Sequence, residues 1–107
     1  MQDRLPPLTH LQFLVLGALR GGEQPGRAIR DELARYGVTR TAAAFYQMMA
    51  RLEAGKLVEG WYEQIAVGDQ AVTERRYRLK PAGARLWEAT LAFYTWAGAA
   101  RERWSDA

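Results

Sequence analysis

The side chains best suited to chemistry lie between residues 40 and 51, and they can form hydrogen bonds and charge pairs. Gln47 carries an amide that can pair with an adenine edge through two hydrogen bonds. Arg40 and Arg51 carry guanidinium groups, whose planar forks suit phosphate oxygens. Helical spacing places these three residues on one side, with Tyr46 beside them. A short helix with this free edge can enter a groove of duplex DNA.

Residue types that support catalysis or metal binding are sparse. The 107 residues contain no cysteine and a single histidine, His10, in the first turn of a predicted helix. No phosphate-binding glycine loop and no cluster with metal-ligand spacing occurs. Glu53 is interpreted as an ion-pair partner of a downstream arginine such as Arg76 or Arg78, in preference to a catalytic carboxylate. The sequence therefore predicts that the protein is not an enzyme and binds neither a metal nor a cofactor.

Apolar periodicity predicts two helices before this segment. Thr9 and Gln12 form a capping box for the first helix, and Gly21-Gly22 ends it. Pro25 is expected as the first helical residue of the second helix, and Gly37 closes that helix. The expected apolar stripe of the second helix consists of Ile29, Leu33 and Tyr36.

A third helix and a β-hairpin are predicted next. Thr39 or Thr41 caps the helix, and Gly55 stops it. Strands are expected over Leu57 to Val67 and Val72 to Leu79, around a Gly68-Asp69-Gln70 turn. The helix residues expected on the buried side are Phe45, Met49 and Leu52. Two short helices, a tight turn and a basic hairpin are typical of a winged helix-turn-helix.

The charge distribution favours a polyanionic partner. The net charge is only +3, but arginines concentrate in the second and third helices and on the returning strand. Residues 27 to 51 carry five arginines against Asp31 and Glu32. The hairpin side carries Arg75, Arg76, Arg78 and Lys80 against Asp69 and Glu74. Arginine suits phosphate and guanine, although a GC-rich genome would give the same preference for arginine over lysine.

Pro81 begins a last helix that is expected to run to about Trp104. It is apolar nearly all round, so it must be buried on more than one side. A second copy of the chain is the simplest cover, giving a two-fold dimer. The predicted interface residues are Leu86, Phe93, Trp96, Ala97, Ala100 and Trp104. Trp87 and Trp96 could hold a flat ligand by stacking, or they could be ordinary interface packing.

The expected fold class is mainly α with a small β-hairpin (α+β): a winged helix-turn-helix with a long C-terminal dimerisation helix. Residues 1–8 are expected to be a flexible lead-in, residues 9–80 the DNA-binding domain, and residues 81–107 the dimerisation helix. The longest uncharged run, Ala89 to Ala100, is shorter than the roughly 20 residues of a membrane span. The N-terminal segment lacks the small-residue cleavage site of a secretory signal. A cytoplasmic protein without membrane partners is therefore expected.

The sequence contains Phe45-Tyr46-Gln47 followed by Arg51-Leu52-Glu53-Ala54-Gly55-Lys56-Leu57-Val58, with Arg75-Arg76-Tyr77-Arg78-Leu79 and Gly83 downstream. In these motifs it resembles the PadR family of bacterial transcriptional regulators. Gly26-Arg27-Ala28-Ile29 matches an early family element only in part. Gln47 stands where proline is common, Arg27 replaces a tyrosine, and Lys80-Pro81 replaces a Thr-Glu cap. The resemblance implies a homodimeric winged-helix DNA binder, usually a repressor and often released by a small molecule.

The expected partners are double-stranded DNA, a second copy of the chain and a small-molecule effector. The predicted DNA-contacting residues are Thr39, Arg40, Thr41, Ala43, Tyr46, Gln47, Arg51, Gln70, Arg75 and Arg76. Among them Gln47 and the residues at the helix start would read bases, while Tyr46 and the arginines would contact phosphates. The alternative is a winged-helix module that binds another protein and no nucleic acid.

Overall fold

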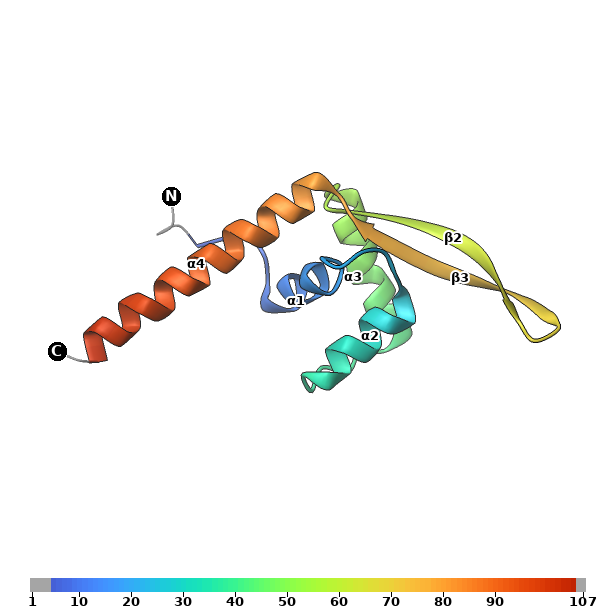
Figure 1. The fold of residues 1–107 in the computed structure, drawn as a ribbon, viewed down its shortest axis with the longest axis horizontal. Coiled ribbons are helices and arrows are strands. Elements are labelled where there is room, and N and C mark those ends of the chain that lie inside the picture. Colours follow the sequence, from blue (N-terminus) through green and yellow to red (C-terminus); the bar gives the residue numbers. More distant parts are fainter. Residues whose placement is uncertain (1–4, 106–107) are drawn as a thin grey trace.

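Residues 5–105 fold as four helices and a three-stranded antiparallel sheet, which confirms the predicted α+β winged helix-turn-helix (Figure 1). The computed structural model describes the backbone of residues 5–105 and the side chains of residues 5–99. Residues 1–4 of the predicted lead-in, and the side chains of Ala100 and Trp104, lie outside this description. The elements are α1 (His10–Ala18), β1 (Gln24–Pro25), α2 (Gly26–Arg35), α3 (Ala42–Ala54), β2 (Val58–Val67), β3 (Gln70–Leu79) and α4 (Pro81–Ser105).

α1 has the predicted start and α2 does not. The Thr9 hydroxyl accepts a hydrogen bond from the main-chain N–H of Gln12 at 3.1 Å. The side-chain oxygen of Gln12 accepts one from the main-chain N–H of Thr9 at 3.0 Å, which completes the capping box. Pro25 is not the first helical residue. It lies in the short strand β1 and is the N-cap of α2, so α2 begins at Gly26. Proline fits there because β1 is an edge strand.

The core forms where the apolar stripes of three helices meet the sheet. α3 buries the predicted Phe45, Met49 and Leu52, which confirms its orientation. Tyr36 was expected in the stripe of α2 but is exposed, because α2 ends at Arg35 and the chain then leaves the helical period. The remaining fully packed apolar residues are Leu8, Val15, Leu16, Leu19, Ile29, Leu33, Val58 and Tyr77.

β2 and β3 form a long hairpin, the wing, which projects from the helical body (Figure 1). β2 starts at Val58, one residue later than expected, because Leu57 still belongs to the cap of α3. The Leu57 amide bonds the Leu52 carbonyl at 3.0 Å, and Lys56 adopts a φ of 60°. β3 starts at Gln70, so the turn is tighter than expected and Gln70 pairs with Val67.

α4 is fixed at its start by close packing against the segment that follows α3. The Lys80 amide donates to the Leu57 carbonyl at 3.0 Å. A Cβ on Gly83 would lie 2.1 Å from the same carbonyl oxygen, so only glycine allows this approach. From there α4 runs away from the body on the side opposite the wing (Figure 1). None of the helices in residues 5–105 combines the length and the apolar character that crossing a lipid bilayer requires.

Replacing Gly83 with alanine should destabilise the fold by about 1–3 kcal/mol, the usual cost of overpacking. The added methyl group meets a backbone carbonyl, which cannot move aside as a flexible side chain can. Urea unfolding followed by circular dichroism measures the effect. Gly98→Ala in the same helix is the control, because open space surrounds the position that its methyl group would take. Equal stability of the two variants would show that the Gly83 contact does not constrain α4.

Candidate nucleic-acid interface

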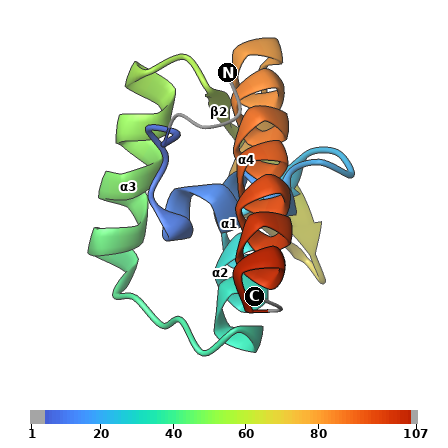
Figure 2. The ribbon, with the colours of Figure 1, turned by 90° about the vertical axis from the view of Figure 1, so that its left-hand side faces the viewer.

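The exposed side of α3 is the candidate surface for DNA. α3 begins after Thr41, whose hydroxyl accepts a hydrogen bond from the Ala44 amide at 3.1 Å. Of the two threonines considered as caps, Thr41 therefore takes the role. Figure 2 shows α3 along one flank of the molecule. The predicted contact residues Ala43, Tyr46, Gln47 and Arg51 are all exposed on it.

Arg30 of α2 holds the turn that leads into α3. Its Nη2 donates to the main-chain carbonyl of Arg40 at 3.1 Å. Gly37 adopts a φ of 79°, which lets the chain turn away from α2. The side chains of Thr39 and Arg40 are exposed at the start of α3. In helix-turn-helix docking, this end of the recognition helix contacts the base edges.

Tyr46 connects α3 to the beginning of α2. Its ring meets Phe45 edge-on, with 5.1 Å between centroids. A Cβ on Gly26 would lie 2.9 Å from the Tyr46 hydroxyl oxygen, so a larger residue at position 26 would displace that hydroxyl. The ring is nevertheless exposed. Its hydroxyl therefore lies beside the first residue of α2.

The end of α3 is joined to the wing by an ion pair. Arg75 Nη2 donates to Glu53 Oε1 at 2.7 Å, and both side chains are mostly buried. Arg75 also stacks on the rings of Tyr62 and Tyr77, at 4.6 and 5.4 Å. The prediction that Glu53 pairs with Arg76 or Arg78 is therefore wrong. Side chains alternate along a strand, so Arg75 faces α3 together with Tyr77, while Arg76 and Arg78 lie on the other face.

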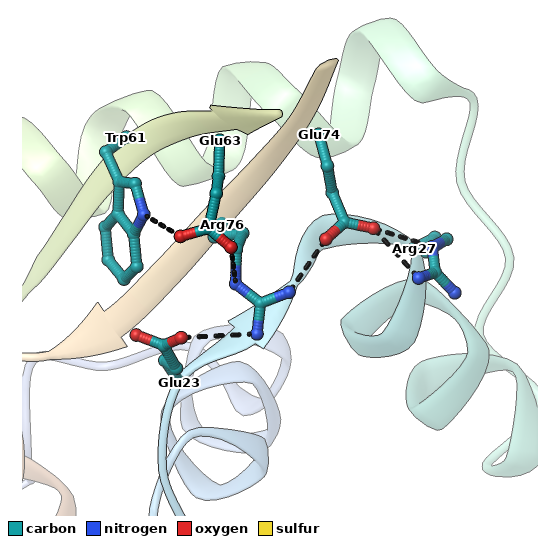
Figure 3. Close-up of polar contacts among 6 residues, drawn as sticks. All are labelled: Glu23, Arg27, Trp61, Glu63, Glu74 and Arg76. Carbon is teal, nitrogen blue, oxygen red and sulfur yellow. Dashed lines mark hydrogen bonds and ion pairs between the residues drawn. The ribbon is translucent and has the colours of Figure 1, made fainter. Parts of the chain in front are cut away.

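Arg76 is the centre of a second network, at the base of the wing (Figure 3). Its Nη1 donates to Glu74 Oε2 at 2.7 Å, and it also lies 3.4 Å from Glu23 and 3.7 Å from Glu63. Arg27 of α2 donates to the other Glu74 oxygen. Burial raises the pKa of Glu74, but the hydrogen bonds from Arg76 and Arg27 outweigh it and hold that pKa below its ordinary value.

The wing is not basic, contrary to the sequence-based expectation. Residues 58–79 carry three arginines against three glutamates and Asp69, which gives the hairpin a net charge of −1. The expectation left out Glu59 and Glu63, and all three arginines are paired with carboxylates; Arg78 is held by Glu59 at 2.6 Å. The predicted DNA contacts of Arg75 and Arg76 therefore compete with existing ion pairs. Gln70, at the tip of the wing, is exposed.

Several solved structures with a similar fold are PadR family regulators. A PadR family transcription regulator from Clostridium difficile R20291 aligns over 90% of this chain and 98% of its own, with a TM-score of 0.76 and 14% identity. A PadR family regulator from Eggerthella lenta DSM 2243 covers 91% and 82%, with a TM-score of 0.67 and 26% identity. Bacillus subtilis PadR, solved in complex with operator DNA, covers 78% of this chain and 47% of its own (TM-score 0.63, 19% identity).

The chain has a PadR-like fold. By sequence alone, it matches no protein-family model, and no curated protein matches it. The likeness therefore lies in the fold, since the sequence identities to the three regulators are only 14% to 26%.

In this PadR-like chain, the first half of α4 packs on its own α1. Trp87 stacks on Phe13 with 5.8 Å between centroids and 12° between the rings, and Tyr94 meets Phe13 edge-on. Leu86 also packs against the core. One chain therefore accounts for the burial of Leu86 and Trp87 without a dimer. Trp96 lies nine residues after Trp87, two and a half turns along, and so on the opposite side of α4.

From Glu88 onward, α4 presents an apolar side to solvent. Trp96 is 42% exposed there and Leu91 is 43% exposed. This side carries Glu88, Leu91, Ala92, Thr95, Trp96 and Ala99. Most of these residues were missed as candidates, although their three- and four-residue spacing along the helix marks one side. Phe93 and Ala97 of the predicted interface are partly buried.

Replacing Gly60 with alanine should break the connection between α3 and the wing and cost about 1–3 kcal/mol. The new methyl group would lie 2.6 Å from Glu53 Oε1 and 2.8 Å from Arg75 Nη2. Chemical unfolding measures the loss. Gly21→Ala is the control, because open space surrounds that position. A Gly60→Ala protein as stable as the control would mean that the ion pair can shift without cost.

Proposed function

We propose that this protein is a DNA-binding transcription regulator that acts as a homodimer on an inverted-repeat operator. The observation that carries the proposal is the exposed side of α3. It presents Gln47 between Arg40 and Arg51, and neither arginine has an ion pair within the described side chains of residues 5–99. A regulator of this kind works in the cytoplasm.

Within this proposal, the side chains of α3 divide into two roles. Gln47, Thr39, Thr41 and Ala43 read base edges from within the major groove. Arg40, Tyr46 and Arg51 contact phosphates and set the register of the helix on the duplex. The wing adds little electrostatic attraction, because its arginines already bind carboxylates. Gln70 at its tip is left as a hydrogen-bonding contact to the adjacent backbone.

The homodimer is proposed from the second half of α4. This part of the helix projects from the body (Figure 1), and it exposes Leu91 and Trp96 beside small residues. Burying such a patch against a second copy removes apolar surface from water. Two recognition helices would then stand about one helical turn of DNA apart, roughly 34 Å.

Repression and release by a small aromatic molecule extend the proposal. A repressor needs only to occupy its operator, which requires no activity beyond DNA binding. The effector would bind between the two copies of α4 at Trp96, since the Trp87 ring is already stacked on Phe13. It would act by binding the DNA-competent and DNA-incompetent dimers unequally.

A winged-helix module that binds another protein is the second candidate. The observation in its favour is the wing tip, where Val67 and Val72 are exposed and where residues 57–74 contain no lysine or arginine. Selection of bound sequences from a random duplex pool separates the two functions. Enrichment of an inverted repeat supports the regulator, whereas failure to retain any duplex at low salt supports the protein-binding module.

Replacing Gln47 with alanine should reduce discrimination between the selected operator and its single-base variants by about 1–3 kcal/mol at one base pair of each half-site. Binding to random duplex should change little, because the lost contact is to a base. Titration of labelled duplexes measures both affinities. Gln64→Ala removes the same amide from the wing and serves as the matched control. Equal losses of affinity for the operator and for random duplex would show that Gln47 does not read a base.

Replacing Leu91 with glutamate should convert the dimer into a folded monomer, because a charge would be buried against the partner helix. Sedimentation equilibrium at micromolar concentrations measures the mass, and circular dichroism checks folding. Val67→Glu places the same charge on the exposed wing tip and should remain dimeric. A wild-type protein that stays monomeric throughout this range would contradict the proposed assembly.

A further inference from the structure

Three arginines converge on a hollow of about 340 Å³ beside the turn between α2 and α3. Arg27 and Arg30 come from α2, and Arg40 comes from the turn itself. Apolar side chains form part of its lining, and Asp31 is the only carboxylate among the described residues that line it. Arg27 is paired with Glu74 from outside the hollow, so Arg30 and Arg40 against Asp31 leave a surplus of positive charge at this concave site. The apolar part of the lining is formed by Leu33, Ala34, Val38 and Phe45.

Two of these arginines have donors to spare. Arg30 gives one Nη2 hydrogen to the Arg40 carbonyl at 3.1 Å, and a guanidinium group has five N–H donors in all. The Arg40 side chain is exposed. The Arg30 hydrogen bond also holds the backbone of Arg40, so the two residues are positioned relative to each other. Planar arginine forks positioned in this way suit the oxygens of a phosphate.

Arg27 is held by a carboxylate but remains accessible. Its Nε and Nη2 both bind the same oxygen of Glu74, at 3.0 and 2.8 Å, yet its side chain is 70% exposed. Glu74 is only 8% exposed. Figure 3 shows Arg27 at the outer end of the network, with Glu74 between it and Arg76. If Arg27 leaves, Glu74 keeps the 2.7 Å bond from Arg76 and so retains a cationic partner.

We propose that Arg27 and Arg30, together with Arg40, bind a backbone phosphate of the DNA, and that Glu74 holds Arg27 in the free protein. Glu74 occupies the Nε/Nη2 edge of Arg27, one of the edges through which a guanidinium binds a phosphate, so the two anions compete for that edge. DNA binding exchanges the carboxylate for a phosphate at this residue. The inference rests on the proposed function, and it assigns to α2 a set of phosphate contacts separate from those of α3.

The first test replaces Arg27 with glutamine and measures affinity for random duplex as a function of salt. Each phosphate contact contributes about 0.9 to the slope of log affinity against log salt. A dimer loses two contacts, so the slope should become shallower by about two. Arg35→Gln is the matched control, because it removes the same charge from the exposed last turn of the same helix, where Arg35 pairs with Glu32. Equal slopes for the two variants would overturn the inference.

The second test replaces Glu74 with glutamine, alone and together with Arg27→Gln. Removing the competitor should tighten duplex binding by up to about fivefold, the factor that corresponds to the loss of an ion pair with an exposed partner, and only while Arg27 is present. Glu63→Gln removes another carboxylate from beside Arg76 without touching Arg27, and it should not show this dependence on Arg27. An equal gain for Glu63→Gln, or a loss on Glu74→Gln in both backgrounds, would overturn the role given to Glu74.

The two levels of the proposal fail in different ways. If the wild-type protein does not bind duplex at low salt, the proposed function is wrong whatever Arg27 does. If the wild type binds with a steep salt dependence and Arg27→Gln matches Arg35→Gln, only the phosphate site is wrong. Should Glu74→Gln fail to fold by circular dichroism, the slope measured for Arg27→Gln still decides the phosphate contact.

Discussion

The ion pair between Glu53 and Arg75 is the interaction on which the geometry of the candidate interface depends. It joins the last turn of α3 to the middle strand of the sheet, over a glycine that leaves room for it. The same strand carries Glu74 and Arg76 on its other face, where they bind α2 and the loop before β1. β3 thus fixes the wing against both helices of the helix-turn-helix. Removing either partner would leave a mostly buried charge, which is costly.

The distribution of free charge follows from this pairing. Every arginine of the wing is bound to a carboxylate, so the hairpin is electrically close to neutral despite its basic appearance. Surplus positive charge remains on α2, the turn and α3. Electrostatic attraction to a polyanion therefore centres on the helix-turn-helix, while the wing acts as a rigid arm. Its exposed valines make the tip apolar and not cationic.

Sequence patterns predicted the elements of this fold better than the partners of its polar side chains. The spacing of Phe45, Met49 and Leu52 identified the buried side of α3, and the Thr9 capping box identified the start of α1, since both signals are local. β1 was missed because two residues show no period, and proline there is also typical of a helix start. The predicted partner of Glu53 was wrong because pairing between residues 22 positions apart in the sequence depends on which face of the strand each arginine occupies.

The candidate site was predictable to the same extent. The exposed edge of α3 followed from helical periodicity, so Tyr46, Gln47 and Arg51 lie where the sequence placed them. Arg27 and Arg30 could not be recognised as neighbours of Arg40, because their meeting depends on the path of the turn. Likewise Trp87 looked equivalent to Trp96 in an apolar helix, and only its stack on Phe13 separates them.

The close approach of Gly83 to the Leu57 carbonyl has a mechanical consequence. Leu57 is the third residue after the end of α3, and its carbonyl also anchors Lys80, the residue just before α4. The end of α3 and the start of α4 therefore meet at a single peptide group. A small tilt of α4 about this contact would also move the end of α3. No flexible linker lies between them at this contact to absorb the motion.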